Sequence, residues 1–175
     1  DICSRFSANI LFKTDSGTVT FGEILTRINN RASFLSENGY SSGDVIAILA
    51  ENSPDWCVTF LAICSIGGIA LPLDINLQKD SFEGMVSAVK AKAVFFSGTH
   101  GESIRSVPVY NIYSSSARQD APVFRHIAVP CDETAAMLFT SGTTGSPKIV
   151  QLTHANLLHI AHVCTELEEY TEKDV

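Results

Sequence analysis

Short apolar runs alternate with helix-length segments over much of this chain, and this alternation limits the folds that it can adopt. The run DVIAILA at 44–50 is continuous and β-branched, which is typical of a strand buried on both faces. Similar runs follow at 69–74 and 93–98, with a helix predicted between them at 79–92, and a fourth strand is predicted at 107–113. Strands separated by helices in this way predict an α/β fold, with a mostly parallel sheet flanked by helices.

Two of the connecting helices carry clear boundary signals. Thr20 and Glu23 form a predicted capping box, which opens an amphipathic helix that ends at Gly39. Ser53 and Pro54 predict the N-cap and first turn of a second, largely apolar helix. The helices and strands predicted from separate signals therefore agree on one fold class.

The second half of the chain has a different organisation. Between Ser114 and Pro130 the periodicity is lost and Ser, Pro and charged residues gather, which predicts an irregular connection. The run AAMLFTS at 135–141 then predicts a strand, KIVQLT at 148–153 predicts a short extended segment, and a helix is predicted to begin at His154.

The segment between these last two extended runs, TSGTTGSPK, has the composition of a phosphate-binding loop. Glycines allow successive backbone N–H groups to point at one anion, hydroxyls add donors, and a lysine adds a mobile positive charge. A polar turn is the alternative, because the patterns G-x-x-x-x-G-K-[ST] and G-x-G-x-x-G are both missing. The candidate ATP- and phosphate-binding residues are Thr140, Ser141, Gly142, Thr143, Thr144, Gly145 and Lys148.

The stretch FTSGTTGSPK resembles the signature [ST]-S-G-[ST]-T-G-x-P-K of the adenylate-forming (AMP-binding) enzyme superfamily, which includes acyl-CoA synthetases, peptide-synthetase adenylation domains and luciferases. VTFGEI, DVIAILAENSPDW, IGGIALPLD and LTHANLL resemble further family segments in the same order, from about Thr18 to Leu158. The segments LPLD and QLTHANL are most similar to those of fatty-acyl (long-chain fatty acid) CoA ligases. One departure is Ile149, which replaces the usual glycine after Lys148 and predicts an extended backbone there.

The resemblance implies an ATP-dependent activation of a carboxylic acid, here a fatty acid, to an acyl-adenylate, with Mg²⁺, followed by thioester formation with coenzyme A. The loop would grip the β- and γ-phosphates, and no catalytic residue or metal ligand is expected within the chain. We expect residues 1–175 to be the N-terminal fragment of the large domain, and to be inactive without the rest of that domain and the small C-terminal domain. The alternatives are a peptide-synthetase-type adenylation domain and a non-catalytic nucleotide-binding module of the same fold.

Composition argues against several other classes of protein. A formal net charge of −7 gives no broad basic surface for nucleic acid. No apolar run is long enough to span a bilayer, so a soluble chain is expected, with peripheral membrane contact left open. The five cysteines form no C-x-x-C pair, and their odd number favours reduced thiols and a cytoplasmic setting.

A few other residues invite a chemical interpretation. His159 and His162 lie three apart on a predicted helix, but a structural role is favoured over metal binding. His154 could assist anion binding near the end of the loop, with capping or packing as the alternative. Trp56 is predicted to be a core anchor, and Cys57 and Cys64 to be small buried side chains.

Overall fold

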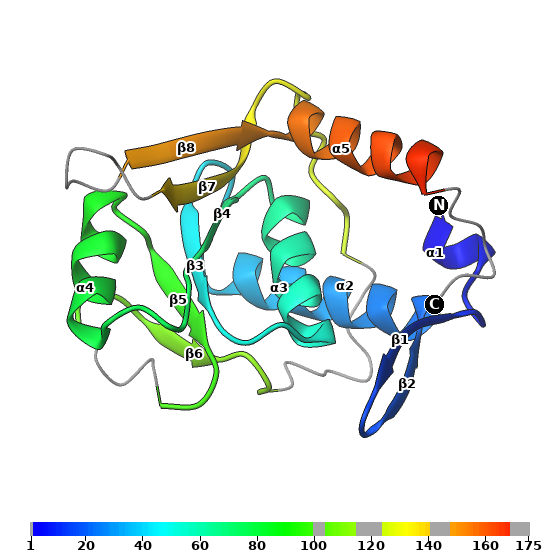
Figure 1. Ribbon diagram of the computed structural model, residues 1–175, viewed down its shortest axis with the longest axis horizontal. Helices are drawn as coiled ribbons and strands as arrows, with labels where there is room; N and C mark the ends of the chain where they lie inside the picture. The colour runs from blue at the N-terminus through cyan, green and yellow to red at the C-terminus, as the bar shows by residue number, and fades with distance from the viewer. Residues whose placement is uncertain (1, 100–103, 115–123, 141–147, 169–175) are drawn as a thin grey trace.

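A six-stranded sheet with helices on both faces forms the centre of the molecule (Figure 1). The computed structural model describes residues 2–99, 104–114, 124–140 and 148–168. The elements in chain order are α1 (Ile2–Arg5), β1 (Ile10–Thr14), β2 (Gly17–Thr20), α2 (Phe21–Glu37), β3 (Val45–Leu49), α3 (Pro54–Ser65), β4 (Ile69–Pro72), α4 (Lys79–Ala88), β5 (Ala93–Phe96), β6 (Val109–Asn111), β7 (Thr134–Thr140), β8 (Lys148–Thr153) and α5 (His154–Leu167).

The strand order is β6-β5-β3-β4-β7-β8, and every neighbouring pair except the last is parallel. Strand β3 lies inside the sheet and pairs with β4 on one side and β5 on the other. The expected α/β fold with a mostly parallel sheet is confirmed. The predicted extended segment is also confirmed, because Ile149 lies in β8 opposite Phe139 of β7.

The side chains of β3 alternate between two hydrophobic clusters. Ile46 and Ile48 pack with α2 and α3 on one face of the sheet. Val45, Ala47 and Leu49 pack with α4 on the other face. This alternation follows from the two-residue period of a strand, and it explains why every β3 position is apolar.

The predicted helix starts are confirmed in detail. The Thr20 hydroxyl accepts from the Glu23 N–H at 3.3 Å, while the Glu23 carboxylate accepts from the Thr20 N–H at 2.7 Å. Ser53 caps α3 by accepting from the Trp56 N–H at 3.2 Å, and Pro54 is the first residue of the helix. Each cap satisfies backbone donors that have no partner inside the helix.

Two features differ from the sequence-based expectations. An antiparallel hairpin of β1 and β2 precedes α2 and was not predicted. Strand β6 is shorter than the predicted 107–113. Of the predicted irregular connection, residues 124–130 contain no helix or strand, and 115–123 lie outside the described residues.

Gly67, at the end of α3, has a backbone conformation that other residues rarely adopt. Its φ is +73°, and a Cβ added there would lie 2.8 Å from the Ser42 hydroxyl oxygen. Gly84 lies within helix α4, and a Cβ added there would meet nothing within 4 Å. The two glycines therefore form a matched pair for testing the fold.

We expect Gly67→Ala to lower the free energy of unfolding by about 1–2 kcal/mol, because alanine is strained at positive φ. Gly84→Ala should raise it by about 0.5–1 kcal/mol, because alanine favours the helix. Urea denaturation of both variants measures the difference. Equal effects of the two substitutions would contradict the assigned backbone at Gly67.

Candidate functional site

The predicted loop is held by a β-hairpin at one edge of the sheet. Thr140 ends β7 and Lys148 begins β8, and the two residues are paired across the hairpin. The Thr140 hydroxyl lies 3.5 Å from the Lys148 carbonyl oxygen, to which it donates a long hydrogen bond. The other predicted site residues, Ser141, Gly142, Thr143, Thr144 and Gly145, lie outside the described residues.

The hairpin places the two ends of this loop, Thr140 and Lys148, at the carboxyl edge of the parallel sheet. Strand β7 runs parallel to β4, so Thr140 lies at the same edge as the ends of β3, β4 and β5. Ala135 and Ala136 are buried in the sheet, whereas Thr140 and Lys148 are exposed. Ligands of open α/β sheets bind outside this edge, because the loops that follow the strands converge there.

A crevice of about 410 Å³ opens at the same edge, between the ends of β3 and β4. It is a topological switch point: the helix after β3 packs on one face of the sheet and the helix after β4 packs on the other. The register that pairs Ala70 with Ala136 puts Asp74 level with Thr140. The crevice therefore lies on the side of the sheet that carries the loop.

The crevice and the loop differ in charge. The crevice is lined by the carboxylates of Glu51 and Asp74, and Asp74 accepts from both the backbone N–H and the side-chain amide of Asn76 at 2.9 Å. Lys148 supplies a positive charge at the base of the loop. Since carboxylates repel phosphates, the loop is the better place for an anion.

Trp56 lies between the core and this crevice. It packs against the cluster around α2 and α3, stacks on Phe60 with ring centroids 5.5 Å apart, and lines the crevice. The core-anchor prediction is confirmed. Its position on the crevice wall is an additional feature that the sequence did not indicate.

His154 lies at the wrong end of β8 to assist the loop. Lys148 pairs with Thr140, whereas Thr153 pairs with Thr134 at the opposite end of the hairpin. At about 3.4 Å per residue, the six residues of β8 place His154 roughly 20 Å from Lys148 at the base of the loop. The anion-binding interpretation of His154 is therefore wrong.

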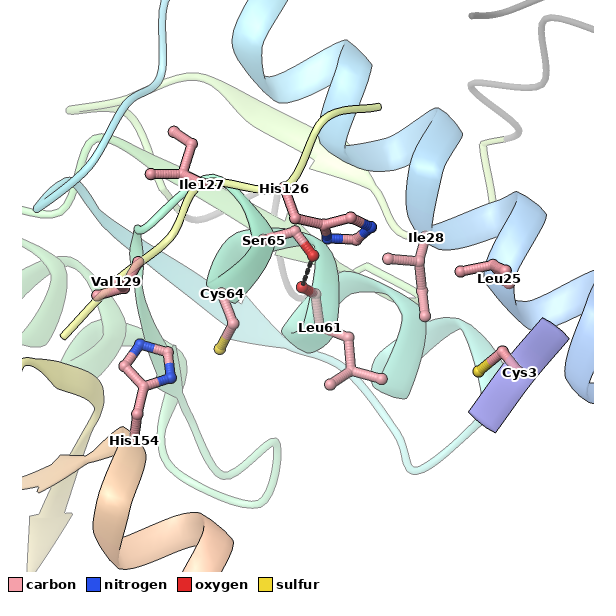
Figure 2. Close-up of a pocket in the computed structure, with 10 residues that line it drawn as sticks. All are labelled: Cys3, Leu25, Ile28, Leu61, Cys64, Ser65, His126, Ile127, Val129 and His154. Carbon is pink, nitrogen blue, oxygen red and sulfur yellow. Dashed lines mark hydrogen bonds between the residues drawn. The ribbon is translucent and has the colours of Figure 1, made fainter. Parts of the chain in front are cut away.

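The alternative role for His154, in packing, agrees with its surroundings. Its N–H donates to the Glu133 carbonyl at 3.1 Å, and its ring lines a groove of about 650 Å³ together with Leu61, Cys64 and Val129 (Figure 2). Thr153, not His154, caps helix α5. Antiparallel pairing of β8 with β7 is the physical reason, since it carries the chain away from the loop.

The other residues that the sequence singled out lie on helices α3 and α5. His159 and His162 are exposed, and the His162 ring lies 3.3 Å from the Glu166 carboxylate. Burial raises the pKa of the Cys64 thiol to about 11, which keeps it protonated. Within the described ranges, no three His, Cys, Asp or Glu side chains form a group that could hold a metal ion.

No helix in the described part of the chain is long and apolar enough to cross a membrane.

Comparisons with known proteins agree with this geometry. The family model for AMP-binding enzymes matches residues 3–175. Fumosorinone synthetase from Cordyceps fumosorosea is 35% identical over 173 residues, which cover 92% of this chain and 4% of that protein. Hybrid PKS-NRPS synthetase iliA from Neonectria sp. is 31% identical over 173 residues, with the same coverage. The NpsA N-terminal subdomain from Klebsiella oxytoca, in complex with 3-hydroxyanthranilyl-AMSN, superposes with a TM-score of 0.73 at 26% identity, over 87% of this chain and 38% of that one.

These relatives correct one expectation from the sequence. They are large synthetases of which this chain spans about 4%, and iliA is named a hybrid PKS-NRPS synthetase. The expected similarity to fatty-acyl (long-chain fatty acid) CoA ligases in particular is not supported. The segments LPLD and QLTHANL therefore do not distinguish fatty-acyl CoA ligases from other members of the superfamily. The match over residues 3–175 and the parallel sheet with its carboxyl-edge hairpin show that this chain belongs to the AMP-binding enzyme family.

Proposed function

We propose that these residues form the ATP-phosphate-binding part of a peptide-synthetase-type adenylation domain. The observation that carries the proposal is the β7–β8 hairpin, whose loop joins Thr140 to Lys148 at the carboxyl edge of the sheet. The similarity to a hybrid PKS-NRPS synthetase supports an adenylation domain of this type over a fatty-acyl CoA ligase. The reaction would be the activation of a carboxylic acid as an acyl-adenylate.

The chemistry requires two anions to meet. The substrate carboxylate attacks the α-phosphorus of ATP, the bond to the pyrophosphate leaving group breaks, and pyrophosphate departs. Repulsion between the carboxylate and the triphosphate opposes this step, so positive charge and N–H donors near the outer phosphates lower its barrier. Lys148 would supply the charge, and the loop would supply the donors. Their work is binding and positioning, without proton transfer.

Mg²⁺ would be brought by ATP in this proposal. Mg²⁺ usually keeps several waters and binds through substrate phosphates and one or two carboxylates, so the outer phosphates of ATP would hold most of it. When bound, the ion would neutralise charge on the triphosphate. The acyl acceptor in a hybrid synthetase would be a carrier-protein thiol, which replaces the coenzyme A that the first resemblance implied.

Ile149 fits this arrangement. It is paired with Phe139 in the hairpin, and its side chain is 41% exposed. A β-branched residue favours the extended backbone found there. Replacement of the usual glycine therefore keeps Lys148 paired with Thr140 at the base of the loop.

Lys148→Ala in the full-length protein should weaken binding of Mg-ATP and of pyrophosphate by about 10- to 100-fold, the usual effect of losing one charged hydrogen bond. Thr143→Val should weaken binding by a smaller factor, because it removes a neutral donor. Calorimetric titration measures both. Lys13→Ala is the matched control, since Lys13 is an exposed strand lysine in β1, outside the sheet that carries the loop. Unchanged ATP binding by Lys148→Ala would contradict the proposed loop.

Pyrophosphate exchange by the full-length protein distinguishes the substrate classes. We expect exchange that depends on an amino acid and on Mg²⁺, no response to long-chain fatty acids, and no activity from residues 1–175 alone. Formation of a fatty acyl-CoA would contradict the proposal and support a fatty-acyl CoA ligase instead. ATP binding without exchange for any acid would instead favour the non-catalytic module.

A further inference from the structure

Helix α2 carries a positive charge into the protein interior. Arg31 is 4% exposed, on the helix face that also buries Ile28 and Leu35. Its Nη1 donates to the Thr59 hydroxyl at 3.2 Å and its Nη2 donates to the Ile112 carbonyl at 2.8 Å. A guanidinium stays charged at any physiological pH, so its burial has an electrostatic cost.

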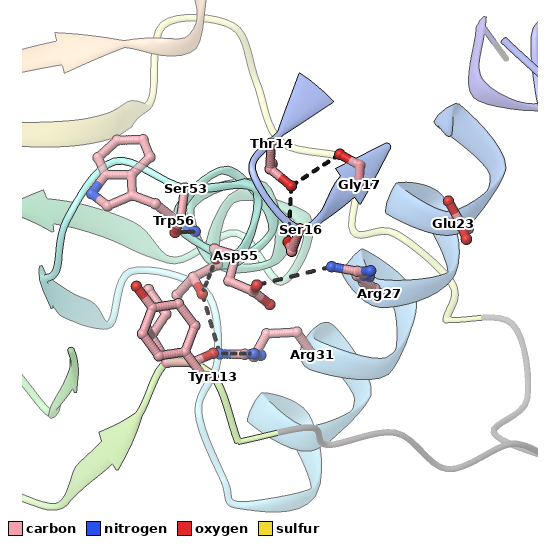
Figure 3. Close-up of polar contacts among 12 residues, drawn as sticks. Thr14, Ser16, Gly17, Glu23, Arg27, Arg31, Ser53, Asp55, Trp56 and Tyr113 are labelled. Atoms are coloured by element: carbon pink, nitrogen blue, oxygen red, sulfur yellow. Dashed lines mark hydrogen bonds and ion pairs between the residues drawn. The ribbon is translucent and has the colours of Figure 1, made fainter. Parts of the chain in front are cut away.

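Among the described residues, no carboxylate forms a direct ion pair with Arg31. Asp55 is the nearby carboxylate, but it pairs with Arg27 at 3.9 Å (Figure 3). Within the ranges that the structure describes, no carboxylate lies within 4.0 Å of the Arg31 guanidinium, and its Nε–H has no hydrogen-bond partner. Burial lowers the pKa of the Arg31 guanidinium, and the nearby Asp55 carboxylate opposes this shift only in part. Two guanidiniums therefore share one carboxylate.

Arg31 lines a cavity of about 290 Å³ with three aromatic residues, Phe34, Phe95 and Tyr110, and with Val109, Asn111 and Ser114. Phe34 lies edge-on to Tyr110 with ring centroids 5.1 Å apart, and Phe95 lies 5.3 Å from Tyr110. The Arg31 guanidinium carbon lies 5.0 Å from the centre of the Phe95 ring. Val109, on edge strand β6, completes part of the wall and is 37% exposed. The cavity thus joins a cation to flat apolar surfaces.

We propose that this cavity binds a small aromatic monocarboxylate, whose carboxylate meets Arg31 and whose ring packs among Phe34, Phe95 and Tyr110. Three of the five guanidinium N–H donors remain after the two protein hydrogen bonds, and carboxylates match the planar guanidinium group. Flat rings pack favourably against the edges and faces of aromatic side chains. The anion would supply the direct ion-pair partner that Arg31 lacks among the described residues.

This site is separate from the ATP loop and does not rest on the proposed function. The cavity lies against β5 and β6, whereas the loop follows β7. Strands β6 and β7 are four positions apart in the sheet, which is about 19 Å at the usual strand spacing. A ligand at Arg31 could therefore not occupy the phosphate loop.

The test uses benzoate as the probe and benzamide as its uncharged counterpart, with the full-length protein and calorimetric titration. Benzoate should bind with at least tenfold higher affinity than benzamide. Arg31→Met should weaken benzoate binding at least tenfold. Val109→Trp fills the cavity from the exposed edge and leaves Arg31 in place. It should also weaken benzoate binding at least tenfold, and it provides the test if Arg31→Met fails to fold.

Two controls locate the binding. Lys13→Ala removes an exposed positive charge on strand β1, outside the cavity, and Lys148→Ala alters the loop. Neither substitution should change benzoate affinity by more than about twofold. Absence of benzoate binding to the wild-type protein would overturn the proposal. Equal binding of benzamide, or full benzoate binding by Val109→Trp, would also overturn it. Loss of benzoate binding in Lys148→Ala would place the anion at the ATP loop instead.

Discussion

The backbone of β3 lies between two strands and under two layers of side chains, and the positions of the other elements follow from this burial. All five β3 residues are buried, so its peptide groups must find partners in β4 and β5, and its side chains must find apolar contacts above and below. Parallel neighbours require crossover helices, and α3 and α4 take opposite faces. The same constraint brings the carboxyl ends of the strands to one edge. Because β7 is parallel to β4, its last residue, Thr140, lies at that edge, and the loop begins there.

The two ends of the β7–β8 hairpin have different surroundings. Near Thr140 and Lys148 the hairpin presents exposed polar groups beside the switch-point crevice. Near Thr134 and Thr153 it borders the groove that His154 lines, and the His154 backbone N–H donates to the Glu133 carbonyl. Antiparallel pairing over six residues keeps the two ends distinct.

Much of the fold could be predicted from the sequence, because apolar periodicity and helix caps are local signals. The capping box at Thr20 and Glu23 and the β-branched run of β3 are examples. The direction of β8 could not be predicted in this way, since it depends on pairing between strands, and His154 was misplaced as a result. Arg31 lies on the apolar period of α2, but only the packed structure shows that its charge is buried. The family followed from the loop signature, whereas the preference for fatty-acyl ligases rested on short wording that does not separate the branches.

In the proposed function, the triphosphate of ATP binds at the carboxyl edge of this sheet, in the loop between Thr140 and Lys148. The most direct measurement is a crystal structure of the full-length adenylation domain with Mg-ATP. We expect the outer phosphates to lie within hydrogen-bonding distance of the Lys148 ammonium and of backbone N–H groups in the loop. Phosphates found in the crevice beside Glu51 and Asp74, or at the opposite end of the hairpin beside His154, would contradict it.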